Sequence, residues 1–487
     1  MIRLMKPNSS AQTPGSSKVK KVPLLLFAVA VLLAGGAATV RGQSALDGFD
    51  PNANSVIFAV TVQPDGKVLI GGQFTTLSPN GGASVARAFI ARLNPDGTVD
   101  PAFNVHPDSY VRAIALQADG KIVIGGDFNH ITPNGGSPII RNYIARLNAD
   151  GTLDLGFDPW TTASVLSIIV QSNGNILVGG NFNHFFPNAS SPGFTRNRIA
   201  RLDINGVPDS FDPNISSTVG YAQVLSMALQ TDGKILASGS FTAVGGVSRT
   251  NIARIDATTG AADSWNPNAN APVWKVALQP DGKILAGGDF NSAISTPTIG
   301  GQTRNRIARL DPTTGLADSW NPNANNSVTA IALQADGKIL VGGSFGAANS
   351  IGGQTRYRLA RLDATNGLAD SFDPNVGGGS GVNTIVVQAD SKILIAGPFA
   401  AFAPNGGATV TRNCIARLQG TPLDFRITNT NIVLSWATNF TGFTLEASTN
   451  LNLNVWSVVS PPPVVSGMFN VVTNTASGPP RFYRLRQ

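Results

Sequence analysis

The chain contains one cysteine and one glutamate in 487 residues. Cys414 has no second cysteine with which to form a disulfide inside the chain,. Because Glu446 is the only glutamate, any pair of carboxylates in the preceding residues must consist of two aspartates,. These absences exclude an internal disulfide and narrow the acid/base chemistry that the chain can offer.

Charged residues are also scarce, at 13% of the chain, and the formal charge of +7 comes from one end. Residues 1–42 carry six basic side chains and no acidic one, and 35 basic residues minus these six leaves 29 against 28 acidic residues. A net charge near +1 gives no electrostatic reason to expect a nucleic-acid partner. We therefore expect none.

Those first residues have the pattern of an export signal. A basic region reaches Lys21, an apolar stretch follows from Val22 to Val40, and cleavage near Gly42 would remove both,. The stretch is also about as long as a membrane span, so an uncleaved anchor is the alternative. In either case we expect a secreted or cell-surface protein, with membrane contact only if residues 1–42 are retained.

Most of the chain consists of seven copies of one motif. Each copy has a short apolar run, Gln-x-Asp-Gly-Lys, a second run ending in Gly-Gly-x-Phe, and Arg-x-x-Ile-Ala-Arg-Leu, with some substitutions. The opening glutamines lie 54, 54, 59, 49, 55 and 54 residues apart, at Gln63, Gln117, Gln171, Gln230, Gln279, Gln334 and Gln388. Such spacing suits one four-stranded blade of a β-propeller.

Each copy supplies the strands and turns of a blade. In the first copy, residues 60–62 and 68–72 flank Asp65-Gly66, a pair that favours a tight hairpin turn,. Residues 89–93 predict a third strand, and Asp96-Gly97 turns the chain into a short fourth strand through residues 99–103.

The ends of the repeat region predict a closed ring. The seventh copy stops at Gln419 without a fourth strand, and residues 46–51 at the front match residues 153–159 of a complete copy. Joining the two ends removes exposed sheet edges. We predict an all-β fold, a seven-bladed β-propeller over residues 44–420 closed by strands from the N- and C-terminal ends.

The period is lost after Gly420. Four strand-like runs follow, with Pro461-Pro462-Pro463 between the third and the fourth. We expect residues 421–487 to form a small β-sandwich module.

The repeat resembles the delta-60 repeat family of secreted bacterial proteins, whose units carry the same three signatures and are expected to form propellers. The tail is similar to fibronectin-type-III-like modules. Copies three and seven depart at the first turn, at Asn173-Gly174-Asn175 and Asp390-Ser391-Lys392. Serine accepts a positive φ poorly, which leaves the type of the seventh turn open. The resemblance brings no established catalytic residues.

The aspartates offer little for catalysis, because nearly all occupy repeated positions. In the repeat region only Asp108, Asp127 and Asp289 do not, and we therefore predict no enzyme activity and no cofactor. His130 and His184 occupy equivalent positions and could share a metal, but two histidines are an incomplete ligand set,. We interpret them as exposed loop residues and predict no metal.

A recurring arginine is followed eight or nine residues later by a recurring aspartate in six copies. We predict a structural ion pair in each of them. In the seventh copy, Arg417 would find Asp47 across the closure.

Strand direction places both Asp-Gly turns on one face and the variable connections on the other, where binding usually resides. The ligand-binding candidates there are Trp160, Phe185, Phe186 and Phe402. Trp265 and Trp320 replace a repeated phenylalanine and are expected in the core,.

The predicted function is a non-enzymatic, monomeric scaffold for adhesion, surface structure or recognition of an extracellular glycan or protein. The alternative is an exported polysaccharide-active enzyme with its site in the propeller channel. A cluster of non-repeated polar residues at the channel mouth would favour the enzyme.

Overall fold

The structure is a computed structural model that describes residues 29–30, 46–187, 193–419, 424–428, 431–437, 444–449, 455–466, 469–475 and 481–486. The chain forms two compact units. The larger comprises Gln43–Gln388 and Lys392–Gln419, and the smaller includes the described residues from 424 onward. The predicted signal segment 1–42 lies outside the described residues except for strand β1 (Val29–Ala30).

In its described residues, the larger unit contains eleven three-stranded antiparallel sheets, and seven of them form an inner set with one sheet per copy of the motif. In chain order they are β2 (Ile57–Val62), β3 (Val68–Gly72) and β6 (Ile90–Leu93); β8 (Val111–Leu116), β9 (Ile122–Gly126) and β12 (Ile144–Leu147); β14 (Val165–Val170), β15 (Ile176–Gly180) and β18 (Ile199–Leu202); β20 (Gln223–Leu229), β21 (Ile235–Ser240) and β24 (Ile252–Ile255); β25 (Val273–Leu278), β26 (Ile284–Gly288) and β27 (Ile307–Leu310); β28 (Val328–Leu333), β29 (Ile339–Gly343) and β30 (Leu359–Leu362); β32 (Thr384–Val387), β33 (Ile393–Ala396) and β36 (Ile415–Leu418). The prediction of an all-β fold is confirmed.

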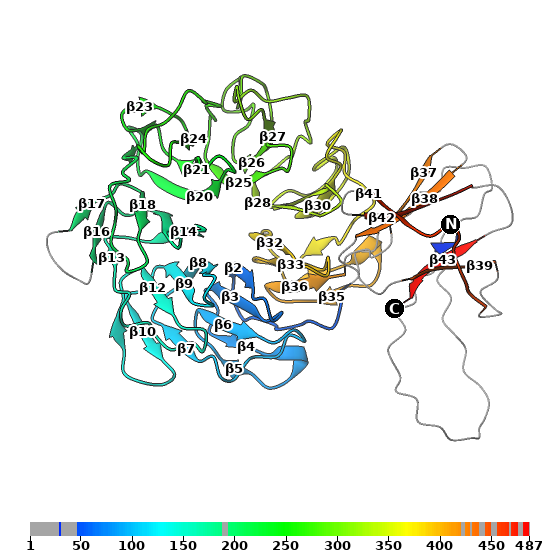
Figure 1. Ribbon diagram of the computed structural model, residues 1–487, viewed down its shortest axis with the longest axis horizontal. Helices are drawn as coiled ribbons and strands as arrows, with labels where there is room; N and C mark the ends of the chain where they lie inside the picture. The colour runs from blue at the N-terminus through cyan, green and yellow to red at the C-terminus, as the bar shows by residue number, and fades with distance from the viewer. Residues whose placement is uncertain are drawn as a thin grey trace. The chain divides into compact units, whose positions relative to one another are not determined.

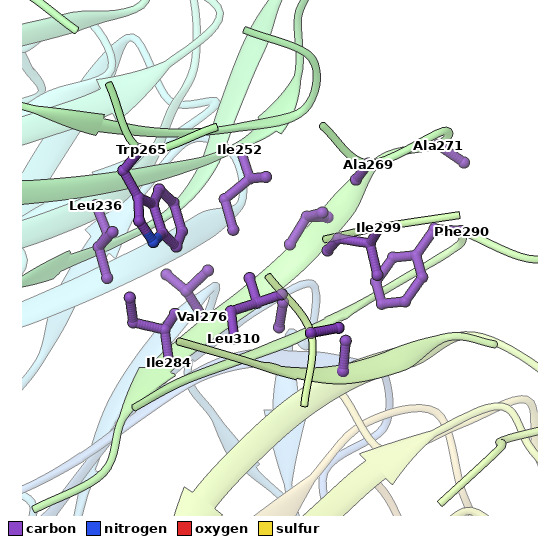
Figure 2. Packing of buried hydrophobic residues seen from close by; sticks show 14 residues of the cluster. Leu236, Ile252, Trp265, Ala269, Ala271, Val276, Ile284, Phe290, Ile299 and Leu310 are labelled. Carbon is purple, nitrogen blue, oxygen red and sulfur yellow. The ribbon is translucent and has the colours of Figure 1, made fainter. Parts of the chain in front are cut away.

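Successive sheets pack face to face, and their first strands lie innermost (Figure 1). Strand β2 of the first sheet also lies beside β32 of the seventh. The strands read as short apolar runs because both faces of each sheet are covered. Figure 2 shows one cluster between the fourth and fifth sheets, in which Trp265 and Leu236 pack beside Val276 and Leu310.

The predicted fourth strand is reduced to a single bridge in each sheet. In the first copy Leu93 pairs with Val99, and the Asp100 amide donates to the Arg92 carbonyl at 2.8 Å. Pairing ends there because the Asp100 carboxylate accepts a hydrogen bond from the amide of Ala102 at 3.0 Å, which turns the chain away,. The prediction of four-stranded blades is therefore corrected to three strands and a bridge.

In the second, third, fourth and seventh copies, the connection between second and third strands forms a smaller outer sheet with the segment that enters the first strand, and in the first copy a two-stranded sheet is joined to that segment by the Ala53–Leu77 bridge. These outer strands are β4 (Thr76–Leu77), β5 (Val85–Ala86), β7 (Val105–Pro107), β10 (His130–Pro133), β11 (Ile139–Ile140), β13 (Trp160–Thr161), β16 (His184–Phe186), β17 (Phe194–Thr195), β19 (Ile215–Ser216), β22 (Ala243–Val244), β23 (Val247–Ser248), β31 (Val376–Gly377), β34 (Ala401–Phe402) and β35 (Val410–Thr411). Short 3-10 turns, η1 (Pro79–Gly81) and η3 (Pro404–Gly406), lie in two connections.

The predicted ion pairs are confirmed, with N–O distances from 2.5 to 2.8 Å. They join Arg92 to Asp100, Arg146 to Asp154, Arg201 to Asp209, Arg254 to Asp263, Arg309 to Asp318, Arg361 to Asp370, and Arg417 to Asp47. Each guanidinium also lies over a buried Phe or Trp ring, between 4.3 and 5.6 Å from its centroid. Trp265 and Trp320 are two of these rings, and both are buried as expected.

The turn of the seventh copy keeps the common geometry despite its serine. Ser391 has a φ of 63°, and the Gln388 amide donates to the Lys392 carbonyl at 2.8 Å, as Gln63 does to Lys67 in the first copy. The ladder between the flanking strands therefore holds the turn in place in spite of the steric cost.

The smaller unit contains, in its described residues, two four-stranded antiparallel sheets. One is ordered β37 (Asp424–Thr428), β38 (Asn431–Ala437), β42 (Phe469–Thr475), β41 (Val464–Ser466); the other β1, β43 (Phe482–Arg486), β39 (Thr444–Ser448), β40 (Ser457–Val458). One buried cluster takes Leu434 and Trp436 from the first sheet and Leu445 and Tyr483 from the second. The four predicted runs correspond to β38, β39, β40 and β43.

Candidate functional site

The seven inner sheets of the larger unit have two chemically different ends. At one, which we call the turn end, the two turns of each copy lie together, since Val68 after the first turn pairs with Leu93 before the second. At the other, which we call the variable end, outer strand β10 of a second-to-third-strand connection pairs with β7 of the segment entering the first strand. The variable connections thus share one end of the sheets, as expected.

Two of the predicted ligand-binding aromatics meet at the variable end. Trp160 on β13 and Phe186 on β16 are cross-strand partners, and their rings stack with centroids 4.5 Å apart and planes at 23°. The ring of His184, two residues before Phe186 on the same side of the strand, lies 6.1 Å from it at 20°,. All three rings are half-buried and so retain some exposed surface.

The other two predicted aromatics are buried. Phe185 alternates with Phe186 along β16 and therefore points the opposite way, where it packs edge to face on Phe182 at 4.8 Å,. Phe402 packs in the same manner on Phe399 at 5.2 Å. Both rings have no exposed area. The structure corrects the assignment of Phe185 and Phe402, which belong to the core and not to the ligand-facing surface.

A residue near the start of the first strand varies among the copies, and six copies have a β-bulge there. In the first sheet Ile57 pairs with Gly72 and Ala59 with Gly71, so that Phe58 is the extra residue,. The bulge requires the second glycine of Gly-Gly-x-Phe, because a Cβ on Gly72 would lie 2.3 Å from the Val56 carbonyl oxygen. We call these six positions the bulge residues: Phe58, Arg112, Leu166, Leu225, Trp274 and Thr329.

A first polar cluster surrounds the bulge residues of copies one and two. The Arg112 guanidinium pairs with Asp127 at 2.7 Å and lies 4.9 Å from the Phe58 ring centroid. The Tyr110 hydroxyl accepts a hydrogen bond from the Gln73 side-chain amide at 2.9 Å. These residues all lie at the variable end of the inner sheets and are outside the repeated pattern.

A second polar cluster surrounds Trp274 in copy five. The indole N–H donates a hydrogen bond to the Asp289 carboxylate at 2.8 Å. The same carboxylate accepts a hydrogen bond from the Ser327 hydroxyl and lies 3.6 Å from the Arg306 guanidinium. Asp127 and Asp289 both occupy the variable position of Gly-Gly-x-Phe, in copies two and five. Each has a cationic neighbour, Arg112 or Arg306. Neither carboxylate is free of protein donors.

Lys275, next to Trp274, is a functional candidate that the sequence reasoning missed. Burial lowers the pKa of its ammonium group,, and no ion pair involves it among the described residues. The other six copies have a small residue at the equivalent position: Ala59, Ala113, Ser167, Ser226, Ala330 and Thr384. A single long cation in a column of small residues was the signal that could have identified it.

The two histidines considered as metal ligands have separate partners. His130 Nδ1 lies 3.1 Å from Asp108, and His184 Nδ1 lies 3.2 Å from Asn183. Within the described residues, no three His, Cys, Asp or Glu side chains are grouped closely enough to hold a metal ion. In the same part of the chain, no helix has the length and apolarity needed to cross a bilayer.

Comparison with known families gives matches within the repeat region. Six segments match a family described as "Domain of unknown function (DUF5122) beta-propeller": residues 63–103, 117–157, 171–211, 230–264, 279–319 and 334–372. These segments correspond to the first six copies of the motif. These matches and the seven repeated sheets support an all-β, propeller-like fold for the larger unit.

Solved structures resemble the chain only distantly. The extracellular domain of a B. thetaiotaomicron protein described as a hybrid two component system is 12% identical with a TM-score of 0.48, over 88% of this chain and 47% of that one. The WD40 β-propeller domain of Doa1 is 12% identical with a TM-score of 0.44, over 78% and 98%. This chain therefore spans about half the length of the first. No curated protein matches the sequence.

Proposed function

We propose that the larger unit is a closed seven-bladed propeller over residues 44–420. Support comes from the contacts that join its two ends. Leu46 pairs with Leu418 and Asp47 with Arg417, as Val99 pairs with Leu93 and Asp100 with Arg92 inside a single copy. Residues 46–50 thus take the place that the fourth segment has in the other sheets.

We propose further that this propeller is an exported, non-enzymatic recognition module for an extracellular polymer, most simply a glycan. The observation that carries the proposal is the stacked row of Trp160, Phe186 and His184 at the variable end. Partly exposed aromatic rings offer an apolar face beside polar groups. A sugar ring, with C–H groups on its faces and hydroxyls at its edge, is complementary to such a surface.

The test is a glycan-array screen of residues 43–487, with supernatants analysed by mass spectrometry for released products. Trp160→Ala and Phe186→Ala should each weaken binding tenfold or more. Tyr221→Ala is the matched control, because Tyr221 is 95% exposed on the connection before β20 and has no ring partner among the described aromatics. Equal loss in the control, or none in the first two variants, would remove the aromatic row from the proposal.

An exported polysaccharide-active enzyme is the second candidate, favoured by the two polar clusters at the bulge residues. Their members vary between copies, as catalytic residues in a ring of repeats would. Release of oligosaccharides by the wild-type chain, and its loss in Asp127→Asn or Asp289→Asn, would establish this candidate. Binding without product in all three proteins would refute it.

We also propose that residues 421–487 form a fibronectin-type-III-like β-sandwich, and that residues 1–42 direct export. The shared cluster of Trp436, Leu445 and Tyr483 between two sheets supports the sandwich. N-terminal sequencing of the exported protein tests the second point, since a mature end near Gln43 is expected and an intact Met1 would indicate an anchor.

A further inference from the structure

A pocket of about 620 Å³, open to solvent, lies at the variable end between the first and seventh copies. One wall is the segment Asn52–Val56 that enters β2, and the others come from Gly378–Ser380, Pro398–Ala400 and Cys414 of the seventh copy. We call it the seam cavity. Its volume is in the range of small-molecule sites, which are about 300–1,000 Å³.

The cavity lies beside a position at which other copies have a bulky or hydrogen-bonded side chain. The residue before each third strand has a positive φ, from 61° to 68°, in all seven: Phe89, Tyr143, Arg198, Asn251, Arg306, Arg358 and Cys414. Such a φ is rare outside glycine and aims the side chain in an unusual direction. In several copies that direction leads toward the following copy, whereas Arg198 and Arg306 contact their own copy, at the Asn181 and Phe182 carbonyls and at Asp289.

Contacts in three other copies show how this side chain covers the boundary. The Phe89 ring lies 5.7 Å from that of Tyr110 in the next copy. The Asn251 amide donates to the Ala269 carbonyl at 2.9 Å, and the Arg358 guanidinium donates to the Val376 carbonyl at 2.7 Å. Each acceptor or ring belongs to the segment that enters the next first strand.

Cys414 is too short to make an equivalent contact. The segment that it would have to reach is Asn52–Val56, and both it and the thiol line the cavity. A second departure adds to the opening, because Gly377, Gly378 and Gly379 before Ser380 carry no side chains. The open boundary is thus a consequence of two substitutions specific to the seventh copy.

The lining indicates the class of ligand. Amide and hydroxyl groups come from Asn52, Asn54, Ser55, Ser78, Ser380 and Asn413, beside the apolar side chains of Val56 and Phe399. Asn413 donates to Asn52 at 2.7 Å and Asn54 bonds to Thr75, so a ligand would use the serine hydroxyls and the remaining amide atoms. No lining residue is charged. Amides and hydroxyls both donate and accept hydrogen bonds, so the surroundings suit a neutral molecule with several hydroxyls and one apolar face.

We propose that the seam cavity binds one neutral sugar residue, at a site separate from the Trp160 row. The site adds a second, pocket-type subsite to the proposed glycan recognition. It rests on different residues, and the two can therefore fail independently.

The test uses Cys414 as a built-in probe, since it is the only thiol in the chain. Burial raises the pKa of this thiol, so labelling by a maleimide should be slow but measurable,. The full mature chain is labelled with and without a panel of methyl glycosides of neutral hexoses and N-acetylhexosamines, and saturation-transfer NMR detects binding directly. At least one glycoside should slow labelling fivefold or more and give an NMR signal.

Filling the cavity after folding avoids variants that fail to fold. The folded protein is converted with benzyl methanethiosulfonate or, as the matched control, with methyl methanethiosulfonate. The benzyl form should lose glycoside binding and the small methyl form should keep it, as should Cys414→Ser. Trp160→Ala should also keep it, which separates this site from the aromatic row.

Three results would overturn the proposal. They are unchanged labelling with every glycoside, binding that survives the benzyl modification, and binding that is lost in Trp160→Ala but not in the benzyl form. The last would assign the signal to the aromatic row alone.

Discussion

The turn end and the variable end of the same sheets follow opposite rules. At the turn end, one carboxylate in almost every copy forms ion pairs with both an arginine and a lysine. Asp154, for example, pairs with Arg146 and Lys121, each at 2.8 Å. At the variable end, the bulge residue changes from copy to copy, from Phe58 to Arg112 to Leu166. The turn end thus repeats the same ion pairs in the copies, whereas the variable end carries residues that differ between them.

The turn-end network also links neighbouring copies. Arg92 Nη1 donates to the Ala149 carbonyl of the second copy, and Arg417 Nη1 donates to the Pro95 carbonyl of the first at 2.8 Å. Because Arg92 and Asp100 are both buried, removal of either would leave a charge without its partner in a region poor in water.

Acid should produce the largest change at the turn end, since several carboxylates act together. Burial alone would raise the pKa of Asp154, but hydrogen bonds from Lys121 and Arg146 hold it below its ordinary value, and the pKa values of Asp100, Asp263, Asp318 and Asp370 are lowered as well. The stability that these groups contribute is present above the unfolded pKa, about 3.9, and is lost as pH falls below it. Urea unfolding from pH 6 to pH 2.5 should show a steep fall below pH 4. A flat profile there would contradict the network.

Asp154→Ala should lower the free energy of unfolding by about 3–5 kcal/mol, because it leaves Arg146 buried without its partner. Asp209→Ala is the matched comparison. Its carboxylate is 33% exposed, and Asn175 stands where the other copies have the lysine. We expect a loss of about 1 kcal/mol there. Urea titrations of both variants measure the difference, and equal losses would show that the buried network has no special weight.

The adjacent rings on β16 should separate stability from binding. Phe185→Ala removes a fully buried ring and should cost about 3–4 kcal/mol of stability,. Phe186→Ala removes a half-buried ring and should cost about 1 kcal/mol,, while it weakens glycan binding. Thermal unfolding and the array screen measure the two effects in both variants. A larger loss of stability in Phe186→Ala than in Phe185→Ala would contradict the assignment of Phe185 to the core.

Lys275→Met should raise the free energy of unfolding by about 1–2 kcal/mol at pH 7, since it removes a poorly solvated ammonium group without an ion-pair partner in the described residues,. The folded pKa of Lys275 lies below the unfolded one. Its cost to stability is therefore largest at low pH and declines as pH rises through the folded pKa. The wild type should gain stability between pH 7 and pH 10 relative to Lys275→Met. Parallel curves would mean that the ammonium is solvated.

The repeat made the sheets and their ion pairs predictable, because seven copies of one pattern separate the required residues from the incidental ones. Arg92 and Asp100 stand eight residues apart in one copy, and Arg254 and Asp263 nine apart in another, yet both pairs form. Single-copy features were harder. The burial of Phe185 depends on an outer strand of three residues, which is too short to show a periodic pattern in the sequence. The turn at Asp100 ends a strand that the apolar residues alone would have predicted to continue.

The Arg417–Asp47 ion pair joins residues 370 positions apart in the sequence, and this distance sets an order of events. A chain that emerges from a ribosome presents Asp47 long before Arg417. Until then the outer face of β2, which lies against β32 in the finished protein, has no cover. Contacts this remote in sequence form slowly, and chains that expose such faces are prone to aggregation. A stop between Asp47 and Arg417 therefore removes this ion pair and, if it falls before β32, leaves β2 without its partner.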